Sequence, residues 1–461
     1  MRVSVVCLVI VALAVTVAAS SSPQGQWTRI TSGGQSGISN IGVARSADGT
    51  LHVIWQRKSG STYDMLHTSI SAAGKVGATT PIVTGWNAVD DADLAIGGHG
   101  ELLAFFAASH STNTYDPLFG LNLATSTDGG SSWVLTPASI YTKNYAYGRT
   151  PSVAVLNGTP IETWYDISAP VVHVGLDPST AVGAYSPSGQ NENIAADPGS
   201  GQVMIASCNS VDQPQGLWVA PVNPASGAPA GSSQRMPGAT SVSAGKEVFS
   251  CPAASRSALV ARVGGGFYAA ALAGYPSQKR LLVWHVGSPK GAVVAQTSSA
   301  FSIQAVALAA APDGRLWVGW SDPYTGGVAR LYLRRSNRAG TVWGQVVTVK
   351  GATPTFLNLD LDAQGGRVDA IARYQSSEGA VDLFHTQVFP GLTLRASGGK
   401  IISFRVTDAG DPVAGATIAI AGKTLRTDAR GNASVDLGRG TFKGVASKAG
   451  YVSVSATVHS T

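Results

Sequence analysis

Three carboxylates in the sequence could work together as an acid and a base: Asp91, Asp166 and Glu192. Glycoside hydrolysis needs two carboxyl groups with separate roles, one that protonates the leaving group and one that acts as base or nucleophile. We therefore take Asp91 or Asp166, together with Glu192, as the candidate catalytic pair. Arg149 is the candidate for holding an anionic group, because a guanidinium binds a carboxylate through two parallel hydrogen bonds.

A wider set of polar and aromatic side chains is expected around that pair. Carboxylates accept hydrogen bonds from sugar hydroxyls, and aromatic rings pack against the apolar face of a sugar. The same mixture also suits an ordinary solvated rim, so the residue types leave both interpretations open. The candidate ligand-binding residues are Tyr147, Arg149, Tyr165, Asp166, Glu192, Asp322 and Tyr324.

A repeated β-hairpin must position these residues. The segments "GVARSADGTLHVIWQ", from Gly42, and "VALAAAPDGRLWVGWSD", from Val306, each predict two alternating strands around a glycine turn. Seven such turns occur, and their mean spacing, (366 − 49)/6 or about 53 residues, suits a four-stranded propeller blade. The marker glycines are Gly49, Gly100, Gly158, Gly201, Gly265, Gly314 and Gly366.

The start of the chain predicts how the ring closes. "QWTRITSG", from Gln26, resembles the fourth strand of other units but has no unit of its own, and the last unit ends near Pro390 without a fourth strand. Pairing the two would close the ring and remove exposed sheet edges. We predict an all-β fold with a seven-bladed β-propeller over residues 24–391, or six blades if one hairpin is misassigned. The candidate site residues would share the face where the innermost strands begin.

The turn "STDGGSSW" combines a short acidic side chain, glycines and a large aromatic ring. An Asp can accept hydrogen bonds from the following backbone N–H groups, glycine tolerates positive φ, and Trp would pack between blades. The spelling resembles the Asp box, or BNR repeat, of sialidase-like propellers, which implies a folding role at the periphery of the ring. Its matching residues are Ser126, Asp128, Gly130 and Trp133. A second copy, "SNRAGTVW", has Arg338 where the Asp is expected.

The resemblance to sialidases ends at this turn. Sialidases use three arginines for the sialate carboxylate, a Tyr nucleophile assisted by a Glu, and an Asp as acid and base. None of these can be placed here residue by residue. "GRTP", from Gly148, has an Arg two positions before a Pro, but it opens the third unit and not the first.

Residues 1–19 are predicted to be a secretory signal peptide, since Arg2 precedes an apolar run that ends in small residues. A retained membrane anchor is the alternative, and no other stretch approaches a membrane span.

In an exported chain, Cys208 and Cys251 indicate a disulfide, with a free thiol as the alternative. Closing that 43-residue loop (251 − 208) would stabilise the fold by ~4 kcal/mol. We expect a secreted monomer, extracellular or at the surface of a bacterium.

The charge pattern argues against nucleic-acid binding, and the remaining motifs argue against a calcium site. The net charge of +6 is spread thinly, without the Lys/Arg cluster that nucleic-acid binding requires. Asp360 and Asp362 begin a fragment of a calcium loop, but Ile371 stands where its glutamate should be, so hairpin spacing explains them better. We expect no metal and no cofactor.

The tail, residues 393–461, is predicted to be a second domain. Short alternating strands and turn glycines indicate a small β-sandwich. The order "GDPVAGA" from Gly410, "TDARG" from Thr427 and Gly450-Tyr451 resembles carboxypeptidase regulatory-like domains, with bacterial Ig-like domains as near relatives. That resemblance implies an accessory role without catalytic residues, although direct ligand binding is an alternative.

These observations favour a secreted, non-catalytic propeller that binds carbohydrate or a cell-surface partner through one polar face. A sialidase-like glycoside hydrolase or lyase using the same face is the first alternative. A purely structural surface protein is the second. Propellers host many unrelated activities, so the fold alone does not choose among them.

Overall fold

The computed structural model describes residues 25–31, 38, 40–109, 120–136, 148–166, 171–177, 180–185, 189–211, 214–251, 256–262, 264–297, 303–321, 329–352, 355–376 and 379–461. Over these ranges every regular element is a β-strand, as the composition predicted, and none is a helix able to cross a membrane. The predicted signal peptide over 1–19 lies outside them.

Seven four-stranded antiparallel sheets follow one another along the described chain, the arrangement predicted from the repeat. We call them blades one to seven. Blades one to three are β2 (Gly42–Arg45), β3 (Leu51–Ser59), β4 (Thr62–Ile70) and β5 (Val76–Trp86); β6 (Ala88–Ile96), β7 (Leu102–Ser109), β8 (Gly120–Ser126) and β9 (Val134–Leu135); and β10 (Gly148–Leu156), β11 (Thr159–Asp166), β12 (Val171–Asp177) and β13 (Thr180–Tyr185).

The remaining blades repeat this order. Blades four to six are β14 (Gln190–Asp197), β15 (Gln202–Asn209), β16 (Gly216–Val222) and β17 (Gln234–Arg235); β20 (Ala258–Ala261), β21 (Phe267–Ala273), β22 (Arg280–His285) and β23 (Ala292–Gln296); and β24 (Gln304–Ala310), β25 (Leu316–Ser321), β26 (Arg330–Arg335) and β27 (Val347–Lys350). Blade seven is β28 (Thr355–Gln364), β29 (Arg367–Gln375), β30 (Val381–Val388) and β1 (Thr28–Arg29).

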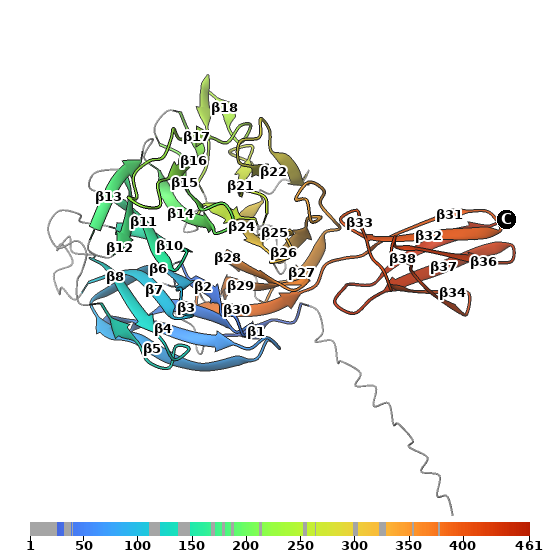
Figure 1. Cartoon of the computed structure of the whole chain (residues 1–461), viewed down its shortest axis with the longest axis horizontal. Coiled ribbons are helices and arrows are strands. Elements are labelled where there is room, and N and C mark those ends of the chain that lie inside the picture. The colour runs from blue at the N-terminus through green and yellow to red at the C-terminus, as the bar shows by residue number, and fades with distance from the viewer. Residues whose placement is uncertain are drawn as a thin grey trace, which may run out of the picture.

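The blades form a ring that the two ends of the propeller close (Figure 1). β1 pairs antiparallel with β30 and supplies the fourth strand that blade seven lacks, as the sequence predicted. Blade one is then held to blade seven by Arg45, which makes ion pairs with Asp362 at 2.5 Å and Asp369 at 2.7 Å. Both contacts join residues more than 300 positions apart, so they form only when the ring closes.

Blade faces pack against each other, which explains why the second strands of blades two, five and six are apolar on both sides. β7, β21 and β25 are buried along their whole length because each lies between two neighbouring blades. Large aromatic rings fill the spaces, and Trp317 is fully buried in a cluster that joins blades six and seven. Each such side chain contributes about 2–3 kcal/mol through burial.

The innermost strands have one edge that no other strand covers, and side chains from neighbouring blades bind its backbone groups. The Asp93 carboxylate accepts hydrogen bonds from the N–H of Val153 and the hydroxyl of Ser152, joining blade two to blade three. Asn193 of blade four donates to the carbonyls of Ser257 and Leu259, at the start of blade five. Buried backbone groups need partners, so these polar residues are part of the architecture.

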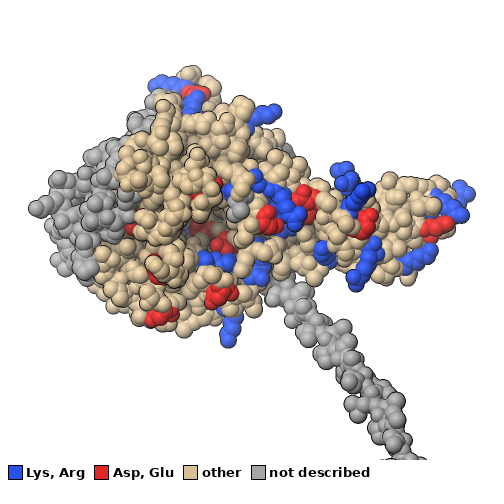
Figure 2. All heavy atoms as spheres, in the orientation of Figure 1, with Lys and Arg blue, Asp and Glu red and all other residues tan. Residues whose placement is uncertain are grey.

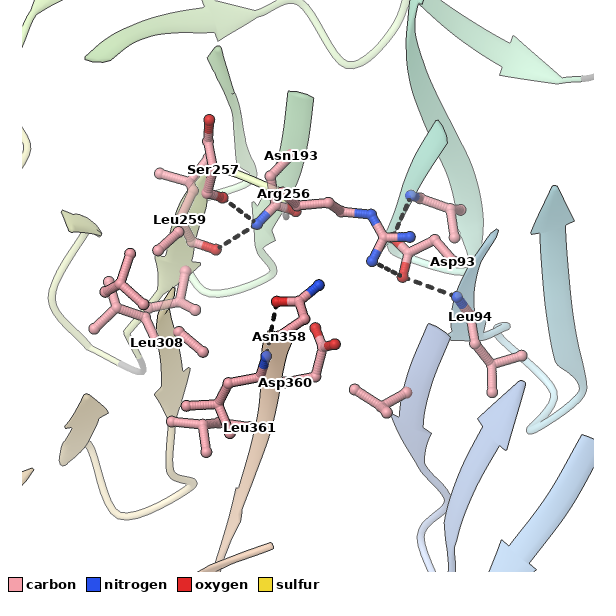
Figure 3. A pocket seen from close by; sticks show the side chains of 17 residues that line it. Asp93, Leu94, Asn193, Arg256, Ser257, Leu259, Leu308, Asn358, Asp360 and Leu361 are labelled. Atoms are coloured by element: carbon pink, nitrogen blue, oxygen red, sulfur yellow. Dashed lines mark hydrogen bonds and ion pairs between the residues drawn. The ribbon is translucent and has the colours of Figure 1, made fainter. Parts of the chain in front are cut away.

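Arg256 crosses the centre of the ring, as Figure 3 shows. It precedes blade five, yet its guanidinium donates to the carbonyls of Ile41, just before blade one, and of Ala92 and Pro151, in the innermost strands of blades two and three. It also lies 3.4 Å from the Asp93 carboxylate. One side chain therefore fastens four blades together.

The turn after β8 has the geometry that its sequence suggested. Asp128 accepts hydrogen bonds from the N–H and hydroxyl of Ser132, and the ring of Trp133 packs edge-on against His67 of blade one. In blade six the corresponding acceptor is Asn337, whose Oδ1 binds the N–H of Thr341 at 2.8 Å. Arg338 stands at the Asp position of this turn, and the neighbouring Asn337 supplies the acceptor in its place.

Two further features complete the described fold. The short hairpin of β18 (Ser241–Ser243) and β19 (Lys246–Val248) lies between blades four and five. Cys208, at the end of β15, is disulfide-bonded to Cys251, which precedes β20, so the bond spans the same two blades.

After blade seven, two sheets enclose a separate apolar core that includes Phe404, Ile418 and Val406. Figure 1 shows this sandwich extending from the side of the ring, with the C-terminus at its far end. Residues 393–461 carry nine Lys/Arg and four Asp, a net +5 of the chain's +6, and Figure 2 shows these basic side chains along the sandwich. Its strands are β31 (Thr393–Gly398), β32 (Ile401–Asp408), β33 (Asp411–Pro412) and β36 (Asn432–Asp436) in one sheet, and β35 (Lys423–Arg426), β34 (Thr417–Ile420), β37 (Gly440–Ser447) and β38 (Val454–Ser460) in the other.

Replacing Arg256 with Met should lower the free energy of unfolding by about 3–5 kcal/mol, because carbonyls of three blades lose their donor and Asp93 loses its buried counter-charge. Urea denaturation of the full chain measures the effect. Arg430→Met removes an exposed arginine from the sandwich and should change stability by less than about 0.5 kcal/mol. Equal, small effects of the two substitutions would contradict the bridging role.

Candidate functional site

β-bulges at the start of several innermost strands position the candidate residues. The pairing register shifts between Val89 and Ala92 in β6, between Arg149 and Ser152 in β10, and between Gln190 and Asn193 in β14. A bulge sets two residues of one strand against one residue of its partner, so it redirects side chains that simple alternation would place. Asp91 and Glu192 therefore lie inside β6 and β14, near the first residues of these strands.

Asp91 and Glu192 are brought together through Thr150. The Asp91 carboxylate accepts hydrogen bonds from the N–H of Asn40 at 3.0 Å and from the N–H of Thr150 at 3.1 Å. The Thr150 hydroxyl then donates to Glu192 Oε2 at 2.5 Å. The three side chains join blades two, three and four, and we call them the mouth triad.

The carboxyl group of Glu192 is completely buried, and this burial raises its pKa from 4.5 to about 8. The Thr150 hydrogen bond opposes the shift by favouring the charged form, while the nearby Asp91 carboxylate adds to it. Glu192 is thus neutral at pH 7. Its Oε1 atom has no hydrogen-bond partner in the part of the chain that the structure describes.

Below the mouth triad, the channel encloses a cavity of about 240 Å³ lined by all seven innermost strands or the residues next to them. Its polar groups are Asp93, Asn193, Arg256, Asn358 and Asp360 (Figure 3). Asp360 lines this cavity, and desolvation raises its pKa to about 6. Arg256 opposes that shift and Asp93 adds to it.

Three half-buried polar residues lie at the same end of blades two to four as the mouth triad. Asp90 and Asn191 are the bulge residues adjacent to Asp91 and Glu192, and each keeps part of its surface exposed. Tyr165, at the end of β11, is also half-buried and pairs in register with Arg149. We call Asp90, Tyr165 and Asn191 the mouth platform.

The predicted site residues divide into three groups. Asp91 and Glu192 do converge, but both are buried. The strands place Arg149 opposite Tyr165 and Asp166 opposite Gly148, at the same end of blade three, with the side chains of Arg149 and Asp166 not described. Tyr147, Asp322 and Tyr324 lie outside the described residues.

Sequence reasoning missed Thr150, Asp93, Asn193 and Arg256. In an alternating strand such as "ADLAI", the polar Asp93 gave a signal, because it stands among apolar neighbours in an innermost strand. Arg256 gave none, since its acceptors lie more than 100 positions away along the chain. Among the described residues, no group of three His, Cys, Asp or Glu side chains could hold a metal ion.

No family model and no curated protein matches the chain. A protein of unknown function from Dyadobacter fermentans is similar in structure, with TM-score 0.48, 12% identity and coverage of 79% of this chain and 98% of that one. An alpha-L-arabinofuranosidase from Fusarium graminearum has TM-score 0.43 and 12% identity, covering 79% and 98%. The polysaccharide lyase Uly1 has TM-score 0.44 and 10% identity, covering 78% and 90%.

The raised pKa of Glu192 predicts a pH-dependent stability. The folded state binds this proton more tightly than the unfolded chain, so the contribution is complete below pH 4.5 and is lost as the pH rises toward about 8. Glu192→Gln keeps a neutral side chain of the same shape. Its urea midpoint should therefore fall less than that of the wild type over this window.

Glu101→Gln, in the turn between β6 and β7, is the matched control and should keep the wild-type pH dependence. If Glu192→Gln and the wild type lose stability in parallel between pH 4.5 and 8, Glu192 is not the group that titrates.

Proposed function

We propose that the protein is a secreted binding protein that holds carbohydrate on the mouth platform without turning it over. The observation that carries this proposal is that the two residues of each bulge differ in exposure. In β6 and β14, one bulge residue is buried in the mouth triad and its neighbour, Asp90 or Asn191, remains half-exposed at the channel mouth. The triad thus fixes the backbone that presents the platform.

The chemistry of the platform suits hydroxyl-rich ligands. A carboxylate accepts hydrogen bonds, and an amide and a Tyr hydroxyl both donate and accept them. The backbones of Arg149 and Asp166, two further candidates, lie at the same end of blade three. Clefts at channel mouths with several convergent polar groups are the usual location of ligand sites.

Burial argues against catalysis by the predicted carboxyl pair. A general acid must come within hydrogen-bond distance of the oxygen that it protonates. Glu192 is 0% exposed and Asp91 is 7% exposed, and both are committed to bonds between blades.

A glycoside hydrolase or lyase is the second candidate, and one observation favours it. Glu192 carries its proton at neutral pH and adjoins a second carboxyl group, which is the state that a general acid needs. A protein ligand at the cell surface, or a purely structural role, would use the same fold without any sugar.

A glycan array followed by mass spectrometry of the incubated sugars tests the proposal. The wild type should be retained on a class of sugars that stay intact. Asn191 has φ of 59°, so Asn191→Gly removes the amide without straining the backbone, and it should weaken retention about tenfold. Asn157→Gly, at φ 53° in the turn at the opposite end of blade three, is the matched control and should bind normally.

The same array separates the second candidate. Trimmed sugars with the wild type and intact, retained sugars with Glu192→Gln would establish the hydrolase and overturn the proposal. A blank array would overturn both carbohydrate functions.

A further inference from the structure

The propeller and the sandwich meet in a groove of about 400 Å³. One wall is blade six, through Arg334 and residues 342–345, and the other is β31 and β32 of the sandwich. The groove is separate from the channel mouth, so a ligand bound here would be independent of any ligand on the mouth platform.

Buried ion pairs fix the relative position of the two walls. Arg335 of blade six pairs with Asp408 of the sandwich, and both side chains are at most 3% exposed. The Arg335 guanidinium also lies 5.5 Å from the ring centres of Trp317 and Tyr451, one from each domain. Arg315 pairs with Asp411 at 2.6 Å. Because these groups are already paired, the groove is formed before any ligand arrives.

Strand alternation makes one wall of the groove polar and basic. In β31 and β32, Leu394 and Val406 are directly paired and point into the sandwich core. The residues on either side point outward instead, so Thr393 pairs with Thr407 and Arg395 pairs with Arg405, all four lining the groove.

The pairing of Arg395 with Arg405 is electrostatically unfavourable unless an anion is present. Directly opposed residues on antiparallel strands have Cβ atoms about 5 Å apart, and like charges there repel. Both arginines are exposed, and within the described chain neither guanidinium makes an ion pair or hydrogen bond. No carboxylate lines the groove, while Arg334 adds a third positive charge from the propeller side.

The propeller wall supplies complementary contacts. Trp343 lines the groove and is half-buried, so part of its ring is available for packing. Gln345, beside it, offers an amide, and its Nε2 lies 3.4 Å from the Thr393 hydroxyl across the groove. An aromatic ring, an amide and two hydroxyls next to a pair of guanidinium groups match a sugar ring that bears an acidic group.

We propose that this groove binds an anionic saccharide. Its carboxylate lies between Arg395 and Arg405, its ring packs on Trp343, and its hydroxyls bond to Gln345 and the threonine pair. The net +5 of the sandwich attracts a polyanionic chain toward the groove (Figure 2).

Binding of three soluble polymers to the full chain, by isothermal titration calorimetry at about 150 mM salt, tests the proposal. Polygalacturonate is the acidic saccharide, dextran the neutral one, and polyglutamate the acidic peptide. We expect the wild type to bind polygalacturonate at least about tenfold more tightly than either of the others. The double variant Arg395→Gln/Arg405→Gln should lose at least about tenfold in affinity for polygalacturonate.

The matched control is Arg426→Gln/Arg430→Gln, which removes two exposed arginines elsewhere on the sandwich. It should bind polygalacturonate within about threefold of the wild type, and thermal melting verifies that both double variants are folded. Equal losses in the two double variants would mean a general basic surface and would overturn the groove. Polyglutamate binding as tight as polygalacturonate binding would replace the saccharide with an acidic peptide, and absence of polygalacturonate binding would overturn the proposal outright.

Discussion

The uncovered edge of each innermost strand is the constraint on which the propeller depends. These edges face the channel, where backbone groups cannot be left without partners. The chain solves the problem with side chains from other blades. Asp91 and Asp93 accept from blade three, and Asn193 donates toward blade five. Arg256 donates to carbonyls at blades one, two and three. The ring is therefore joined at its centre by polar contacts and between blade faces by apolar packing.

This constraint also shapes the candidate site. Asp91 and Glu192 form a predicted catalytic pair. In the structure their carboxyl groups join neighbouring blades of the ring. Neutral Glu192 lets the mouth triad exist without two adjacent buried charges, which would repel strongly at this depth. We therefore assign the proposed ligand binding to the platform residues and to the groove at the sandwich.

The sequence predicted the features of the fold that depend on local residue patterns. Turn glycines and alternation indicated the hairpins, and the unmatched strand after Gln26 indicated the ring closure. It could not predict burial at the bulges, because one extra residue reverses which side chain faces inward, as for Asp90 and Asp91. The bridging role of Arg256 could not be predicted because its hydrogen-bond acceptors come from three blades that are distant in the sequence.

The most direct test of a neutral mouth triad is the protonation state of Glu192 itself. The chain has five glutamates, so ¹³C labelling of glutamate carboxyl groups gives few NMR signals, and Glu192→Gln identifies the one that belongs to residue 192. We expect this signal to titrate near pH 8. Titration at or below the ordinary value of 4.5 would mean that Glu192 is charged at neutral pH, and it would contradict a neutral mouth triad.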